Sequence, residues 1–125
     1  RGRLAVLEIL CVALAVYFES RGEPIEGQYA VASVVWNRRN DPRWPDHTCE
    51  VGAEKGQFES WPLIKAQLNA EYLERNPAMR KALAAASFTA EEPTTRALFF
   101  AQAGYLKFEY LETIGNHEFY IPHEE

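Results

Sequence analysis

The stretch Cys11–Gln28, which reads CVALAVYFESRGEPIEGQ, decides the fold of this 125-residue chain. It predicts an apolar helix that runs up to Glu19, ends at Gly22 and gives way to a second helix at Pro24. Glycine tolerates the left-handed conformation that often ends a helix, and proline suits a first helical position. Burial disfavours the charged form of a carboxylate, so an acid at the end of an apolar helix is a candidate for proton transfer.

The two helices around this break follow from hydrophobic spacing. Residues 4–20 are apolar at almost every position, which predicts a central helix that is buried on most of its surface. Residues 24–39 place Tyr29 and Trp36 on one face of a second helix. A buried first helix with a second helix beside it indicates an α-rich core.

Two more helices are predicted further along the chain, over residues 62–75 and 77–87. Asn76 suits the N-cap of the second of them and Pro77 its first position. Residues 46–60 show no clear periodicity, so most of that section is interpreted as loop.

The C-terminal part of the chain has a different pattern. Residues 96–101 form a short apolar and aromatic run, and residues 113–122 place a Gly-Asn turn before alternating apolar positions. Both patterns predict strands. The expected fold class is therefore mainly α (α+β), with about four helices around a central apolar helix and a small β element. A single domain over residues 1–125 is expected.

Composition and charge narrow the classes of function. Hydrophobic residues make up 47% of the chain and charged residues 25%, which is normal for a globular domain with a real core. The formal net charge is −5 at pH 7. A nucleic-acid binder would carry a basic face, so no nucleic-acid partner is expected.

The N-terminus resembles a signal peptide, because a basic start is followed by the apolar run 4–16. Glu8 interrupts that run, and the run leads directly into the residues around Glu19. It is also shorter than the roughly 20 apolar residues that a membrane-spanning helix needs. We therefore expect a core helix without stable membrane insertion. No targeting segment is visible in this chain.

Cys11 and Cys49 are the two cysteines of the chain. Two are too few for a disulfide scaffold or a zinc ribbon. They form either one disulfide, in an oxidising compartment, or two free buried thiols. The sequence leaves both readings open.

Two carboxylates four residues apart, Glu19 and Glu23, are candidates for acid–base chemistry. Glu19 suits a general acid, and the alternative is a helix-end carboxylate paired with Arg21 or Arg38. In a continuous helix Glu23 would share its face and complete the carboxylate pair of a glycosidase. The break at Gly22 favours instead a role for Glu23 in bracing the start of the second helix.

Other catalytic patterns are weak in this sequence. The histidines at positions 47, 117 and 123 lack the HExxH spacing of a zinc site, so neither a metal nor another cofactor is expected. The serines lack a GxSxG nucleophile elbow. Cys11 lies within the apolar helix, which favours a structural role.

A resemblance adds to this reading. Residues 14–24 (LAVYFESRGEP) and 26–38 (EGQYAVASVVWNR) resemble the signature of the spore cortex-lytic enzyme family of cell wall hydrolases. Three shorter matches follow at 43–49, at Gln57-Phe58 and at 114–120 (IGNHEFY), so the resemblance covers about residues 11–120. Departures include Ser20 in place of the usual alanine and an acidic tail.

The resemblance implies a lysozyme-like domain related to lytic transglycosylases. Glu19 would protonate the oxygen between N-acetylmuramic acid and N-acetylglucosamine and would then act as base on the muramoyl 6-hydroxyl. That hydroxyl closes a 1,6-anhydro ring, so neither water nor a second carboxylate is required. Gln57, Phe100, His117 and Tyr120 are assigned to substrate binding, with a purely structural role as the alternative for each.

The implied partner is the peptidoglycan glycan strand, and the protein is expected to act as a monomer at the bacterial cell wall. The periplasm, the extracellular space and delivery by a phage, as an endolysin, all fit that location. Muramidase-type hydrolysis is an alternative reaction, with water in place of the 6-hydroxyl. A non-catalytic wall-binding or virion structural module is an alternative of another class.

Overall fold

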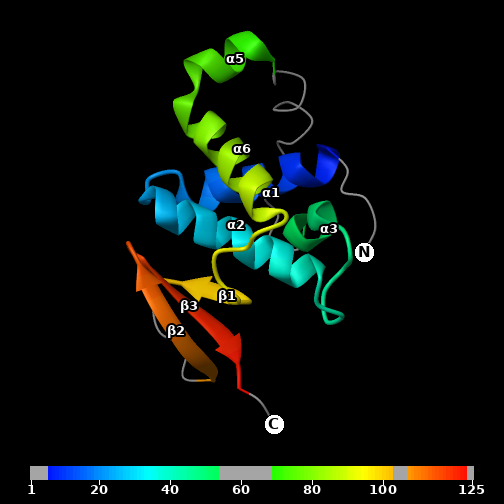
Figure 1. Cartoon of the computed structure of the whole chain (residues 1–125), viewed down its shortest axis with the longest axis vertical. Coiled ribbons are helices and arrows are strands. Elements are labelled where there is room, and N and C mark those ends of the chain that lie inside the picture. The colour runs from blue at the N-terminus through cyan, green and yellow to red at the C-terminus, as the bar shows by residue number, and fades with distance from the viewer. Residues whose placement is uncertain (1–5, 54–68, 103–106, 124–125) are drawn as a thin grey trace.

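The computed structural model describes residues 6–53, 69–102 and 107–123. Three helices, α1 (Val6–Ser20), α2 (Ile25–Arg39) and α6 (Pro77–Thr89), pack against one another. A small antiparallel sheet lies below α2, on the side away from α6 (Figure 1). The prediction of a mainly helical fold with a small β element is confirmed. Within the described ranges, every helix falls short of the length and hydropathy that crossing a bilayer requires.

Helix α1 is buried on most of its surface, as the sequence predicts. Val12, Leu14 and Val16 each have 1% of their surface exposed or less. Trp36 of α2 is fully buried beside them and donates its indole N–H to the Ala86 carbonyl of α6 at 3.0 Å. Because the indole N–H has a partner, the large ring is buried without an unsatisfied donor.

A short helix, α3 (Thr48–Ala53), stands where the sequence suggests loop, so that part of the prediction is wrong. One and a half turns carry too little periodicity to be recognised, and a helix of that length is unstable alone. Contacts with α1 stabilise it here: the Thr48 hydroxyl donates to the Glu8 carbonyl at 2.8 Å. Cys11 and Cys49 form a disulfide between the two helices, which closes the question that the sequence leaves open.

A buried ion pair joins the same region to α2. The Glu8 carboxylate accepts hydrogen bonds from Arg39 at 3.1 and 3.2 Å and from the Thr48 backbone N–H at 3.2 Å. Burial alone would raise the pKa of Glu8, but these hydrogen bonds and the charge of Arg39 together lower it. Removing one partner of such a pair leaves the other charge buried and typically costs about 3–5 kcal/mol.

Two helices follow residue 69, namely α5 (Ala70–Arg75) and α6. The side chain of Asn76 accepts a hydrogen bond from the Met79 N–H at 3.1 Å, so the predicted N-cap of α6 is confirmed. The predicted helix over 62–75 is confirmed only as α5, because residues 62–68 lie outside the described residues.

The sheet has the strand order β1–β3–β2. Strand β1 (Phe99–Ala101) and strand β2 (Phe108–Ile114) each pair antiparallel with β3 (His117–Pro122), and the β2–β3 register shifts between Tyr110 and Glu112. The predicted strands are confirmed, the first of them only over its last three residues. Asn37 of α2 donates to the carbonyls of Thr95 and Ala97, which fixes the approach to β1.

Candidate active site

Glu19 lies in the last turn of α1, where the buried helix reaches the edge of the core. Its side chain is half-buried. The helix then ends in a turn in which the Glu23 N–H donates to the Ser20 carbonyl at 2.9 Å. Gly22 is not in the left-handed region, so the expected left-handed end of α1 is wrong; among the described residues, Gly115 is the glycine with positive φ, at 60°. The hydrogen-bonded turn from Ser20 to Glu23, rather than a left-handed glycine, therefore ends α1.

Glu19 borders a small cavity between three helices and the sheet. Its walls are apolar apart from two charged side chains, Glu19 and Arg38. The apolar part comes from α1 (Ala15), α2 (Val31, Val35), α3 (Val51, Gly52) and β1 (Phe100). The volume is about 20 Å³. The Glu19 side chain therefore borders a small, mostly apolar space rather than being fully buried in the core.

Helical spacing explains how α1 and α2 reach this cavity. Ala15 and Glu19 are four residues apart on α1 and lie on one face. Val31, Val35 and Arg38 follow the spacing i, i+4, i+7 on α2, which places them on one face as well. That spacing is readable in the sequence and could have predicted this face, whereas the contribution of α3 could not be read from periodicity.

Arg38 is held in a fixed position beside the cavity. Its Nε–H donates to the Leu98 carbonyl at 2.7 Å. Its guanidinium carbon lies 5.6 Å from the ring centroid of Trp44 and 5.2 Å from that of Phe99. Cation–π contacts and a main-chain hydrogen bond thus restrict the planar group on several sides. From the sequence, Arg38 is predicted to be either a charge at the C-terminal end of a helix or a partner of Glu19.

Glu23 makes quite different contacts. Its carboxylate accepts the Asn116 backbone N–H at 2.7 Å and the Asn116 side-chain amide at 3.0 Å. His117 Nδ1 lies 3.6 Å from the same carboxylate. The backbone hydrogen bond from Asn116 is the main reason that the pKa of Glu23 is lowered, and it outweighs the effect of burial. The geometry confirms the bracing role for Glu23: it holds the turn between β2 and β3 against the start of α2.

Two buried polar atoms lie near this brace. Gln28 donates through Nε2 to the Glu23 carbonyl at 3.1 Å, but its Oε1 has no hydrogen-bond partner among the described residues, and neither does His117 Nδ1. The imidazole of His117 packs edge-to-face on Phe100, with ring centroids 5.2 Å apart. His117 therefore packs against the ring of Phe100, which itself lines the cavity.

The predicted site residues divide into three groups. Glu19 and Phe100 share the cavity, and His117, 5% exposed, stands behind Phe100. Tyr120 is not among the described residues that line the cavity; it is 3% exposed and donates its hydroxyl to Glu118 at 2.9 Å. Gln57 lies outside the described residues. Within the described part of the chain, no group of three or more potential metal ligands occurs.

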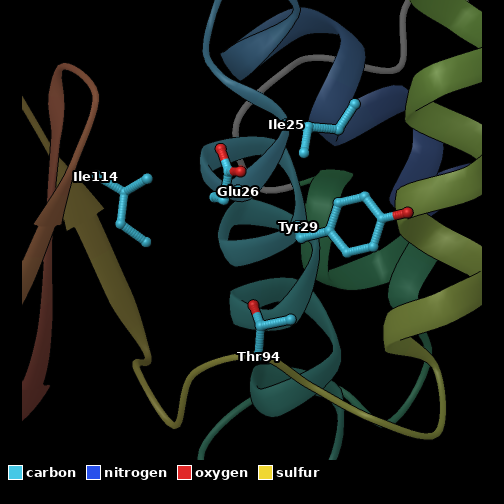
Figure 2. A pocket seen from close by; sticks show the side chains of 5 residues that line it. All are labelled: Ile25, Glu26, Tyr29, Thr94 and Ile114. Atoms are coloured by element: carbon cyan, nitrogen blue, oxygen red, sulfur yellow. The ribbon is translucent and has the colours of Figure 1, made fainter.

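A larger pocket of about 310 Å³ opens on the opposite face of α2. Figure 2 shows Ile25 and Tyr29 on the helix, Thr94 below them and Ile114 across from them on the sheet. Its acidic member, Glu26, is exposed. This pocket is much larger than the cavity at Glu19, but the described residues that line it include no cationic side chain and no half-buried acid, so the chemistry favours the smaller cavity.

Comparisons with known proteins show which relatives this chain resembles in sequence and in fold. A sequence model described as Cell Wall Hydrolase matches residues 22–120, a stretch that begins just after Glu19. The chain is 36% identical to the spore cortex-lytic enzyme of Bacillus subtilis over 93 residues, which cover 74% of this chain and 28% of that protein. The spore cortex-lytic enzyme of Oceanobacillus iheyensis is 38% identical over 93 residues, again 74% of this chain, and 32% of its length is covered. The chain thus spans about a third of these relatives or less.

Two solved structures have a similar fold. The catalytic domain of the germination-specific lytic transglycosylase SleB from Bacillus anthracis aligns with a TM-score of 0.66 and 26% identity, covering 96% of this chain and 98% of that one. The catalytic domain of the Bacillus cereus SleB protein aligns with a TM-score of 0.65 and 28% identity, covering 96% and 94%.

Proposed function

The chain belongs to the Cell Wall Hydrolase family, and on that premise we propose that it cuts the glycan strands of bacterial peptidoglycan by lytic transglycosylation. The bond cleaved lies between N-acetylmuramic acid and N-acetylglucosamine. Glu19 serves first as the acid and then as the base. A similar structure carries the description lytic transglycosylase, and this supports transglycosylation over muramidase-type hydrolysis.

One observation carries the proposal: a half-buried carboxyl group stands at the end of the central helix and opens onto a cavity. Glu23, the other carboxylate of the motif, is held by two hydrogen bonds from Asn116. A mechanism that needs a single acid–base group fits this arrangement better than one that needs two.

The reaction balances without water. Glu19 gives its proton to the glycosidic oxygen as the bond from C1 of the muramoyl sugar to that oxygen breaks, and the released sugar gains a hydroxyl. The Glu19 carboxylate then takes the proton of the 6-hydroxyl as that oxygen bonds to C1. The enzyme returns to its starting state, and the muramoyl end becomes a 1,6-anhydro sugar. Proton transfer of this kind contributes typically about 10²–10⁴-fold to a rate.

Digestion of purified peptidoglycan in heavy-oxygen water tests this reaction. Mass spectrometry of the products should show 1,6-anhydro ends that contain no heavy oxygen, because no water is consumed. Reducing ends that carry heavy oxygen would establish hydrolysis and would overturn transglycosylation. Retention on the wall without any new ends would establish a binding module instead.

A further inference from the structure

Arg21 is an exposed cation that follows Glu19 by two residues. Its guanidinium carbon lies 4.8 Å from the ring centroid of Tyr17, four positions earlier in the chain. Among the described residues, the Arg21 side chain forms neither a hydrogen bond nor an ion pair, so it is not the partner of Glu19 that the sequence allows. The charge and the N–H donors of Arg21 are therefore available to a ligand.

The aromatic ring under Arg21 is held from its far end. The side-chain amide of Asn76 donates to the Tyr17 hydroxyl at 3.4 Å and to the Tyr72 hydroxyl at 3.0 Å. The oxygen of the same amide accepts the Met79 N–H and so is fixed at the start of α6. A cation–π contact with a ring held in this way restricts the guanidinium before a ligand arrives, which reduces the entropy lost on binding.

Phe18 adds an exposed apolar surface next to this cation. Its ring packs edge-to-face on Tyr17, with ring centroids 5.5 Å apart, and 40% of the residue is exposed. Tyr17, Phe18 and Arg21 together form what we call the Arg21 patch, at the end of α1. A guanidinium beside an exposed aromatic ring suits a ligand that carries a carboxylate close to small apolar groups.

The substrate of the proposed reaction brings such a ligand within reach. The Cα atoms of Glu19 and Arg21 are at most about 7 Å apart, because two residues span no more than that. When C1 of the muramoyl sugar lies at Glu19, the lactyl group on C3 of the same ring is nearby, and the stem peptide begins there. The lactyl carboxyl is used in the amide bond to this peptide. The first free carboxylates therefore belong to the stem peptide, whose alanines also supply methyl groups.

We propose that the Arg21 patch binds a carboxylate of the stem peptide on the muramoyl sugar that is cut, with Phe18 contacting an apolar side chain of that peptide. The inference rests on the proposed function, since it presumes that this sugar lies at Glu19. In residues 17–24 the other charged side chains are Glu19 and Glu23, which repel a carboxylate. Arg21 offsets this repulsion and is thereby a specificity-determining residue that favours strands with acidic peptides.

Chemical neutralisation of the stem peptides tests the proposal. Uncross-linked glycan strands with acetylated amino groups are used either as they are or after carbodiimide coupling of their carboxylates to ammonia, which leaves the sugars and the peptide length unchanged. The rate at which 1,6-anhydro ends appear gives kcat and KM for each substrate. For the wild type, KM should be about three- to tenfold higher on the neutral strands, the range of an exposed charge-assisted hydrogen bond, with kcat unchanged.

Variants connect this selection to the Arg21 patch. Arg21→Gln should raise KM on the acidic strands to the value for the neutral strands, so that the difference between the substrates disappears. Arg96→Gln is the matched control, because it removes the same charge from an exposed arginine that pairs with Glu109 on the sheet, and it should keep the difference. If Arg21→Gln lowers kcat equally on both substrates and keeps the difference in KM, Arg21 acts on Glu19 instead and the proposal fails.

The outcomes separate the two proposals. If the wild type forms anhydro ends with the same KM from both substrates, the peptide proposal fails while the proposed function stands. A difference that persists in Arg21→Gln, or that disappears in Arg96→Gln, also overturns the assignment to this patch. If neither substrate gives anhydro ends, the proposed function itself fails.

Discussion

Glu19 and Glu23, two carboxylates four residues apart in the same motif, lie in different environments. Glu19 stands at the end of α1 and opens onto a small apolar cavity beside Arg38. Glu23 stands past the helix break and is held by the backbone and side chain of Asn116. The difference shows that the turn at Ser20–Glu23, rather than residue type, separates a group suited to chemistry from a group that holds the fold.

The largest expected effect belongs to Glu19→Gln. The amide keeps the shape of the side chain but cannot deliver and recover a proton, so the rate of glycan cleavage should fall by at least about 10²–10⁴-fold. The melting temperature should stay close to that of the wild type. Glu26→Gln, an exposed carboxylate of the pocket in Figure 2, is the matched control and should stay within about twofold in rate.

Gly115→Ala should have the next largest effect, which is a loss of folding stability. A Cβ at this position would lie 2.5 Å from the Glu23 carboxylate, and φ is 60°, a region that costs roughly 1–2 kcal/mol for residues other than glycine. Together these effects should lower the free energy of unfolding by about 2–4 kcal/mol in chemical denaturation. Gly22→Ala is the control, because nothing lies within 4 Å of its Cβ position. Equal losses in the two variants would contradict the brace.

Glu23→Gln should have a smaller effect. A glutamine amide oxygen accepts a hydrogen bond from Asn116 less strongly than a carboxylate does. The amide NH₂ group would also face one of the two Asn116 N–H donors, so that one of these hydrogen bonds would be lost. We expect a loss of about 1–3 kcal/mol in the free energy of unfolding at neutral pH. Activity should fall less than about tenfold. A larger loss of activity without a loss of stability would assign Glu23 to the chemistry instead.

The same pair predicts a pH dependence. The pKa of Glu23 is lower in the folded protein than in the unfolded chain, where a glutamate titrates near about 4.3. Its contribution is therefore fully present above that value and is lost as the pH falls through the folded pKa. The gap in stability between wild type and Glu23→Gln should shrink over this acidic window. A gap that widens on acidification would mean that the carboxylate is not stabilised by Asn116.

The sequence predicts one side of this comparison better than the other. The apolar run before Glu19 and the Gly-Pro break after it locate both the central helix and the candidate acid, because local patterns determine both. The brace depends on Asn116, which is 93 positions from Glu23, and no periodicity connects residues so far apart. Only the general role of Glu23 followed from the break in the helix.

The walls of the cavity show the same limit. Val31, Val35 and Arg38 share a face by helical spacing, so this part of the site was present in the sequence pattern. Helix α3 could not be recognised in the sequence pattern, because it is short and depends on Glu8, Thr48 and the disulfide for its stability. Its contribution of Val51 and Gly52 appears only when the tertiary contacts are in place.

The most direct test of the central claim compares Glu19→Gln with Glu23→Gln on the same purified peptidoglycan, at a temperature where both are folded. The measured quantity is the rate at which 1,6-anhydro ends appear. If Glu19 alone transfers the proton, Glu19→Gln should be at least about 100-fold slower than wild type while Glu23→Gln stays within about tenfold. Comparable rates for Glu19→Gln and the wild type would contradict the assignment of Glu19.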